Sequence, residues 1–176
     1  MPATLQSIFY RRNLDILDQE KIGSYLGLRM TKAHLKYFQN PKMPTVKDGD
    51  KAMTQILKSE YSIQNLFDKL KYPLKISEEI QITDLEELDK FLQTRTKEDI
   101  DIILRYNNSL VQINKKGGGH FSLISEYDSV SKEVLILDPD PPFWKKMKLE
   151  DLHTSISDKL DGIKRGFYIV EQIFNK

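Results

Sequence analysis

The spacing of apolar residues changes character about half-way along the chain. In the first half, apolar residues recur at helical intervals between polar ones. This pattern predicts helices over residues 24–39, 50–59, 62–71 and 84–95. Asp84 is a suitable N-cap for the last of these helices, and the stretch before it, residues 74–82, alternates as a strand does. The N-terminal half is therefore expected to be mainly helical.

The second half carries short segments rich in branched aliphatic and aromatic residues, separated by Gly, Asn, Ser and Pro, which is typical of strands. We expect strands over residues 101–104, 121–127, 133–138 and 166–174, and one further helix over 149–156. The connection between the second and third strands, DSVSKE, has hairpin length, so these two strands are expected to pair antiparallel. A helical half followed by an antiparallel half predicts an α+β fold, with the helical half packed on the sheet.

Length and composition narrow the classes of protein that fit this pattern. The 176 residues show no internal repeat or linker, so we expect a single domain over residues 1–176. With 27 Lys and Arg against 26 Asp and Glu, the chain lacks the excess positive charge of a general nucleic-acid binder. No apolar run approaches the roughly 18 to 20 residues of a membrane span. The N-terminal residues do not resemble a secretory signal, so a cytoplasmic location is expected, with export by another route left open.

The absence of cysteine excludes disulfides, thiolate metal sites and a thiol nucleophile within the printed sequence. The three histidines, His34, His120 and His153, include no pair at the i, i+4 spacing of helical metal ligands. We therefore expect neither a metal nor another cofactor. His34 falls within a predicted helix and His153 within another, and both are expected at the surface.

His120 and Asp138 are the residues most suited to catalysis. His120 opens one strand of the predicted hairpin and Asp138 closes the other, so their side chains are expected to meet. A carboxylate on one imidazole nitrogen fixes the tautomer and leaves the other nitrogen as a base. Asp140, two residues further along, is a second candidate for the orienting carboxylate. Both aspartates also suit a purely structural role as turn residues.

Several elements in this part of the chain resemble the papain-like catalytic domain of phytochelatin synthases and, more loosely, the C39 peptidases. The resemblance covers roughly residues 100–170, including Tyr127 and the segments GGHFS (118–122), ILD (136–138), PPFW (141–144) and RGF (165–167). It implies that His120 is the general base and Asp138 its orienting acid. It also implies a cysteine at the start of the first long helix, preceded by a glutamine of the oxyanion hole.

The chain departs from the family pattern at the nucleophile. Residues 19–27 are the only segment that resembles the Gln-to-Cys stretch of the family, with Gln19 as its glutamine. In one register Ser24 takes the nucleophile position, at the expected N-terminus of the helix over 24–39, although serine is also a common helix cap. In the other register Leu26 takes that position and no nucleophile is present. A serine in this position is what an inactivating substitution of the cysteine would produce.

Three interpretations of function remain. In the first, the chain is a papain-like thiol hydrolase or acyltransferase acting on a peptide, isopeptide or γ-glutamyl amide, inactive or weakened because residue 24 is serine. In the second, it is a catalytically silent pseudo-peptidase that binds a peptide or protein partner. In the third, it is an unrelated α+β protein. In the first two, we expect the ligand beside residues 117–119, where backbone can approach closely, and beside Trp144 after two prolines.

Overall fold

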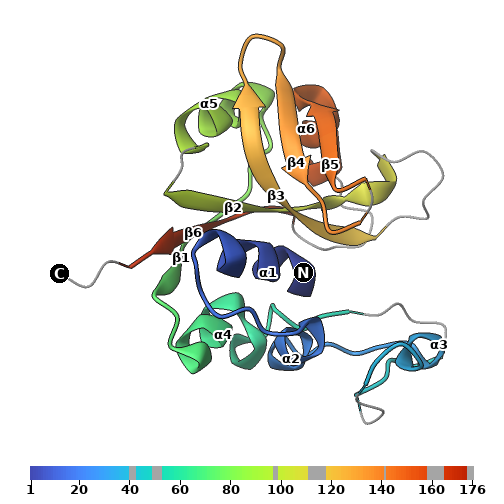
Figure 1. The fold of residues 1–176 in the computed structure, drawn as a ribbon. Coiled ribbons are helices and arrows are strands. Elements are labelled where there is room, and N and C mark those ends of the chain that lie inside the picture. Colours follow the sequence, from blue (N-terminus) through green and yellow to red (C-terminus); the bar gives the residue numbers. More distant parts are fainter. Residues whose placement is uncertain are drawn as a thin grey trace. The chain divides into compact units, whose positions relative to one another are not determined.

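The computed structural model describes residues 1–39, 43–48, 53–96, 99–110, 118–140, 142–157 and 165–173. The chain forms two units, Met1–Leu74 and Lys75–Lys176 (Figure 1). The first unit contains α1 (Pro2–Arg11), α2 (Gln19–Tyr25), α3 (Lys32–Leu35), the 3₁₀ turn η1 (Ser59–Tyr61) and α4 (Ile63–Leu70). Strand β1 (Leu74–Ile80) begins at Leu74, which is the last residue of the first unit. The second unit continues with α5 (Leu85–Arg95), β2 (Ile100–Asn107), η2 (Asn108–Leu110), β3 (Gly119–Asp128), β4 (Glu133–Leu137), β5 (Trp144–Lys148), α6 (Leu149–Ser157) and β6 (Gly166–Gln172). The expected α+β class, with helices first and the sheet after, is confirmed.

The caps of two predicted helices are formed as their sequences indicate. Asp84 accepts a hydrogen bond from the backbone N–H of Glu87 at 2.9 Å, which confirms it as the N-cap of α5. Ser62 accepts one from Asn65 N–H at 3.2 Å at the start of α4. The predicted helices over 62–71 and 84–95 are thus confirmed, as is the one over 149–156, which appears as α6. Local capping chemistry decides where α4 and α5 begin.

The predicted helix over residues 24–39 is wrong, because a helix ends where it was expected to begin. Gly27 has a φ of +62°, and the N–H of Leu28 donates to the carbonyl of Gly23 at 2.8 Å. With the bond from Gly27 N–H to Ser24 O at 3.2 Å, this forms a Schellman motif that ends α2 at Tyr25. Only the four-residue α3 lies within the rest of that range.

One further prediction fails in the first unit, and one of its helices was not predicted. The expected helix over 50–59 begins outside the described residues, and its described part forms a bridge from Met53 to Arg29 and then a turn. The first helix, α1, was not predicted. It starts with proline in its first turn, a favoured position, and buries Leu5, Ile8 and Phe9 at helical spacing.

The described strands form one six-stranded sheet in the order β1-β6-β2-β3-β4-β5. Neighbouring strands from β6 to β5 pair antiparallel, and the predicted β3–β4 hairpin is confirmed, with a register shift between Ile124 and Glu126. Strand β5 was not predicted. Its sequence, WKKMK, has too few apolar residues to indicate a strand, but lysines are typical of an exposed sheet edge.

Helices α5 and α6 supply the apolar side chains that cover one face of the sheet. The core includes Leu88 and Leu92 from α5 and Leu152 from α6, together with Leu104 and Ile136 from the strands. This packing anchors β2, β3 and β4, the strands that carry the candidate site described below. Among the described residues, no helix is both long and apolar enough to cross a membrane.

Gly166, at the start of β6, has no room for a side chain. Its φ is +147°, and a Cβ atom there would lie 2.1 Å from the backbone oxygen of Ile80. We therefore expect Gly166→Ala to lower the free energy of unfolding by about 3 kcal/mol, from backbone strain and the contact with Ile80. Urea denaturation monitored by circular dichroism measures the change. Gly119→Ala is the matched control, because no atom lies within 4 Å of a Cβ built there. An equal loss in both variants would contradict this explanation.

Candidate active site

His120 lies near the start of β3, where its neighbours in β2 and β3 hold it in place. It is the second residue of β3 and lies opposite Tyr106 of β2 in the strand register. The two rings meet edge to face, with centroids 5.5 Å apart. This contact restricts the rotation of the imidazole, which is partly buried.

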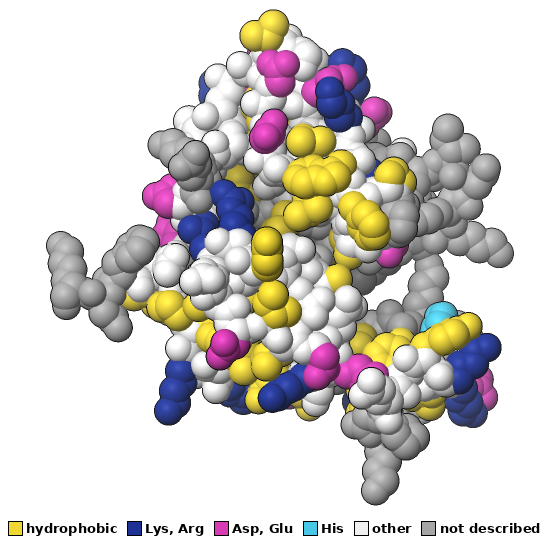
Figure 2. All heavy atoms as spheres, in the orientation of Figure 1, with side chains coloured by type: hydrophobic (Ala, Val, Ile, Leu, Met, Phe, Trp, Pro, Cys, Tyr) yellow, Lys and Arg dark blue, Asp and Glu magenta, His cyan; other side chains and the backbone are white. Residues whose placement is uncertain are grey.

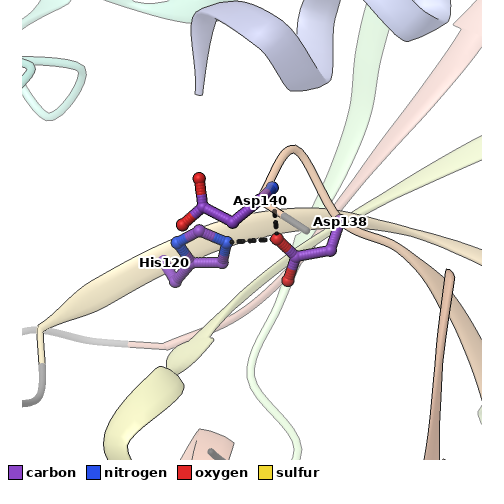
Figure 3. Close-up of side chains that lie close together, drawn as sticks. All are labelled: His120, Asp138 and Asp140. Atoms are coloured by element: carbon purple, nitrogen blue, oxygen red, sulfur yellow. Dashed lines mark hydrogen bonds and ion pairs between the residues drawn. The ribbon is translucent and has the colours of Figure 1, made fainter. Parts of the chain in front are cut away.

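Asp138 follows the last residue of β4 and is buried beside His120. The Nε2 atom of His120 lies 3.0 Å from Oδ1 of Asp138, which confirms the expected contact (Figure 3). The turn after β4 holds this geometry, because the N–H of Asp138 donates to Phe143 O and the N–H of Asp140 donates to Oδ1, both at 2.8 Å. The backbone of the Asp-Pro-Asp turn therefore aims the carboxylate at the imidazole.

The second oxygen of Asp138 is satisfied by three side chains from three strands. Its Oδ2 accepts hydrogen bonds from Tyr106 Oη at 2.8 Å and Ser122 Oγ at 3.1 Å. It also lies 2.9 Å from the ammonium Nζ of Lys145. Neither Tyr106 nor Lys145 was predicted at the site, because only the pairing of β2 and β5 with their neighbours brings them here. Ser122 stands in the GGHFS segment but was given no role.

These contacts keep the carboxylate of Asp138 ionised. Burial raises the pKa of Asp138, but the hydrogen bonds from His120 and the Asp140 N–H and the ammonium of Lys145 outweigh it, so the pKa lies well below its usual range. Burial, together with the negative charge of Asp138, raises the pKa of Tyr106 well above its usual range. Asp138 is therefore an anion at neutral pH and Tyr106 stays a hydrogen-bond donor. A neutral His120 then carries its proton on Nε2, which leaves the lone pair of Nδ1 available as a base.

Asp140 lies close to both His120 and Asp138 (Figure 3). One ligand-type atom from each of His120, Asp138 and Asp140 lies within 4.8 Å of the other two. The group does not fit a metal ion, because the ammonium of Lys145 already neutralises Asp138 and Nε2 of His120 is directed at the same carboxylate. The hydrogen bond from Nε2 is accepted by Asp138 and not by Asp140. Of the two aspartates considered from the sequence, Asp138 therefore stands in the orienting position.

The other predicted site residues lie in the first unit. Gln19 is the first residue of α2, and Ser24 is exposed in the last turn of that helix. The expectation that Ser24 stands at a helix N-terminus is therefore wrong. Leu26, in the alternative register, is completely buried. His120 and Asp138 lie in the second unit.

The remaining histidines have no comparable surroundings. His34 is exposed, as expected, and its Nδ1 lies 2.8 Å from Oγ1 of Thr31. His153 is partly buried, and its Nε2 lies 2.9 Å from the carbonyl of Thr83. Both contacts are ordinary side-chain hydrogen bonds.

Apolar side chains stand exposed just beyond the Asp138 turn. Phe143 and Trp144 are each 57% exposed, which is unusual for adjacent large aromatic residues. Figure 2 shows further hydrophobic side chains exposed at the surface in this view. Of residues 117–119, expected beside the ligand, Gly117 lies outside the described residues. A Cβ built at Gly119 would meet no atom, so the backbone there is open to a ligand.

A family model for phytochelatin synthase matches residues 29–167. The chain belongs to the phytochelatin synthase family. Its His120 and Asp138 lie inside the matched range, and the family resemblance of this region is confirmed. The family match begins at Arg29, so Gln19, Ser24 and Leu26 lie before it. Among curated proteins, none matches the chain.

The anionic Asp138 makes a specific contribution to stability. Asp138→Asn removes the partner of a buried ammonium, so we expect a loss of about 3 kcal/mol at pH 7. Because the folded-state pKa of Asp138 is lowered, this contribution is present above the unfolded value of about 3.9 and is lost as the pH falls below it. Urea denaturation between pH 7 and pH 3 should show the gap between the two proteins shrinking below about pH 4.

Asp140→Asn is the matched control for this variant. Its backbone N–H still donates to Asp138, and its own carboxylate is exposed, so its effect should stay within about 0.5 kcal/mol. A gap for Asp138→Asn that is constant with pH would contradict the assignment of the charge to Asp138.

Proposed function

We propose that this chain has the fold and base-acid pair of a papain-like acyl-transfer domain. The reaction would cleave or transfer the acyl group of a peptide, isopeptide or γ-glutamyl amide through a thioester intermediate. The observation that carries the proposal is the 3.0 Å contact between His120 Nε2 and a buried Asp138, in a chain of the phytochelatin synthase family. In this proposal residues 1–176 act as a single catalytic domain, and the family points to γ-glutamyl or peptide amides as substrates.

The proposed chemistry assigns one proton path to His120. A thiol loses its proton to Nδ1 of His120 and its sulfur attacks the amide carbon, forming a C–S bond. The tetrahedral intermediate collapses, the C–N bond breaks, and the proton on Nδ1 passes to the leaving nitrogen. Water or an acceptor amine then gives a proton to Nδ1 and attacks the thioester carbon. The C–S bond breaks and the proton returns to the sulfur, which completes hydrolysis or transfer. Asp138 stays ionised and holds the ring in position throughout.

The position of the nucleophile is the open part of the proposal. Ser24, with Gln19 as the oxyanion donor, is the candidate that the sequence pattern favours. At the C-terminal end of α2, however, a thiolate would face carbonyl groups, whose dipoles disfavour negative charge. The family resemblance assigns the nucleophile to the start of the first long helix. In the structure this helix is α1, whose N-cap is residue 1. Residue 1 is therefore a second position to test.

A silent pseudo-peptidase is the second candidate function. The observation that favours it is the printed sequence itself, which has no cysteine. In this case the exposed aromatic residues Phe143 and Trp144 and the open backbone of Gly119 would hold a peptide without reaction. Both candidates use the same binding surface and differ only in the nucleophile.

Single cysteines in this cysteine-free chain distinguish the candidates. We expect the chain as it stands to be inert or nearly so, because a serine hydroxyl is a far weaker acid than a thiol. If residue 24 takes the nucleophile position, Ser24→Cys gives a thiol that reacts with iodoacetamide well below pH 8, and adding His120→Ala abolishes that advantage. The same measurement is made on Leu26→Cys and on Met1→Cys placed behind an added initiator methionine. The rate of alkylation against pH is the readout.

Ser129→Cys provides the reference for an ordinary exposed thiol, because Ser129 lies in the turn at the other end of the β3–β4 hairpin. A His120-dependent thiol at residue 1 or 26 in place of residue 24 would move the nucleophile to that position. If all of these cysteines react like the reference, the enzyme proposal fails and the pseudo-peptidase takes its place.

A further inference from the structure

Strand β5 carries three lysines, and one of them differs from the other two. Lys145 lies opposite Ile136, a core residue of β4, so its side chain shares the face of the sheet that α5 and α6 cover. Its side chain is only 13% exposed. Lys146 and Lys148 are 73% and 54% exposed and lie near Glu133. A lysine on the inner face of a sheet costs desolvation energy and needs a compensating partner.

We propose that Lys145 is a positioning residue of the candidate active site, which orients the carboxylate of Asp138 toward His120 and offsets its negative charge. The ammonium lies 2.9 Å from Oδ2, the oxygen that does not face the imidazole. With Tyr106 and Ser122 on the same oxygen, it prevents the carboxylate from turning. Oδ1 is thereby left for His120.

Lys145 also sets the balance of charge around the imidazole. The charged and titratable groups at the site are Asp138 after β4, Asp140 in the turn, Tyr106 on β2 and Lys145 on β5. Without Lys145, the carboxylate of Asp138 would face His120 without the cation that lies 2.9 Å from it. Such a field favours the imidazolium form, which cannot accept a proton. Lys145 therefore offsets negative charge that would otherwise favour that form.

This inference rests on the proposed function for its meaning, since a base is needed only if a nucleophile is activated. It goes beyond that proposal in assigning a role to a residue outside the base-acid pair. A different explanation for an inward lysine on an edge strand is protection against pairing with another sheet. That role depends on the charge at the strand edge and would not change the titration of His120.

The test is the titration of the His120 ring by NMR in the full chain. Lys145→Met keeps the length of the side chain and removes its charge, and should raise the pH midpoint of the His120 signals by about 1 unit. Lys145→Arg retains the charge and should restore the midpoint. Lys146→Met, one residue away on the outer face, is the matched control and should leave it unchanged. A midpoint unmoved by Lys145→Met, or moved equally by Lys146→Met, would overturn the proposal.

A second measurement applies even if Lys145→Met does not fold. In the unaltered chain, the Nζ protons of Lys145 should exchange slowly with water, and their signal should shift as His120 titrates. Fast exchange like that of Lys146 would overturn the proposal. Neither measurement involves a cysteine, so the outcome is independent of the alkylation experiment that tests the proposed function.

Discussion

The buried charge of Asp138 is the constraint on which the arrangement of the strands around His120 depends. An ionised carboxylate loses several kcal/mol of hydration when it is buried, and only close donors offset that loss. Here the donors come from β2, β3, β5 and the backbone of the following turn. A slip of one residue in any of these strands would turn a donor to the opposite face. The carboxylate therefore ties the strand register to the geometry of His120.

The turn end of the β3–β4 hairpin, away from His120, is also held by an ionised aspartate. Asp89 of α5 accepts hydrogen bonds from Tyr127 Oη at 2.6 Å and from Lys132 Nζ at 2.5 Å. These bonds lower the pKa of Asp89 to about 2, so it remains charged. Tyr127 belongs to the segments that resemble the family, and its role here is to tie β3 to the helix behind it. A hairpin fixed at both ends presents His120 on a rigid support.

The parts of this structure that were predictable from sequence are those decided by local chemistry. The cap at Asp84 and the β3–β4 hairpin depend on residues close together in the chain, and the hairpin alone brings His120 to Asp138. The end of α2 depends on the backbone of Gly27, which apolar spacing does not reveal. Strand β5 has little strand character of its own and forms because β4 offers it an edge. Lys145 and Tyr106 could not be assigned, since their position at the site follows from strand pairing.

The composition of the polar cluster argues that it serves more than stability. Replacing a buried ion pair by apolar side chains of similar size is often neutral or stabilising. The same face of β2, β3 and β4 is otherwise filled with residues such as Leu104, Ile124 and Ile136, so an apolar solution was open at this end of the sheet. Instead the end of that face holds a histidine whose Nδ1 is left as a base, an ionised aspartate and a lysine that balances it. Such an arrangement gives no more stability than apolar packing would, but it provides a proton acceptor, which is the property that the proposed acyl transfer requires.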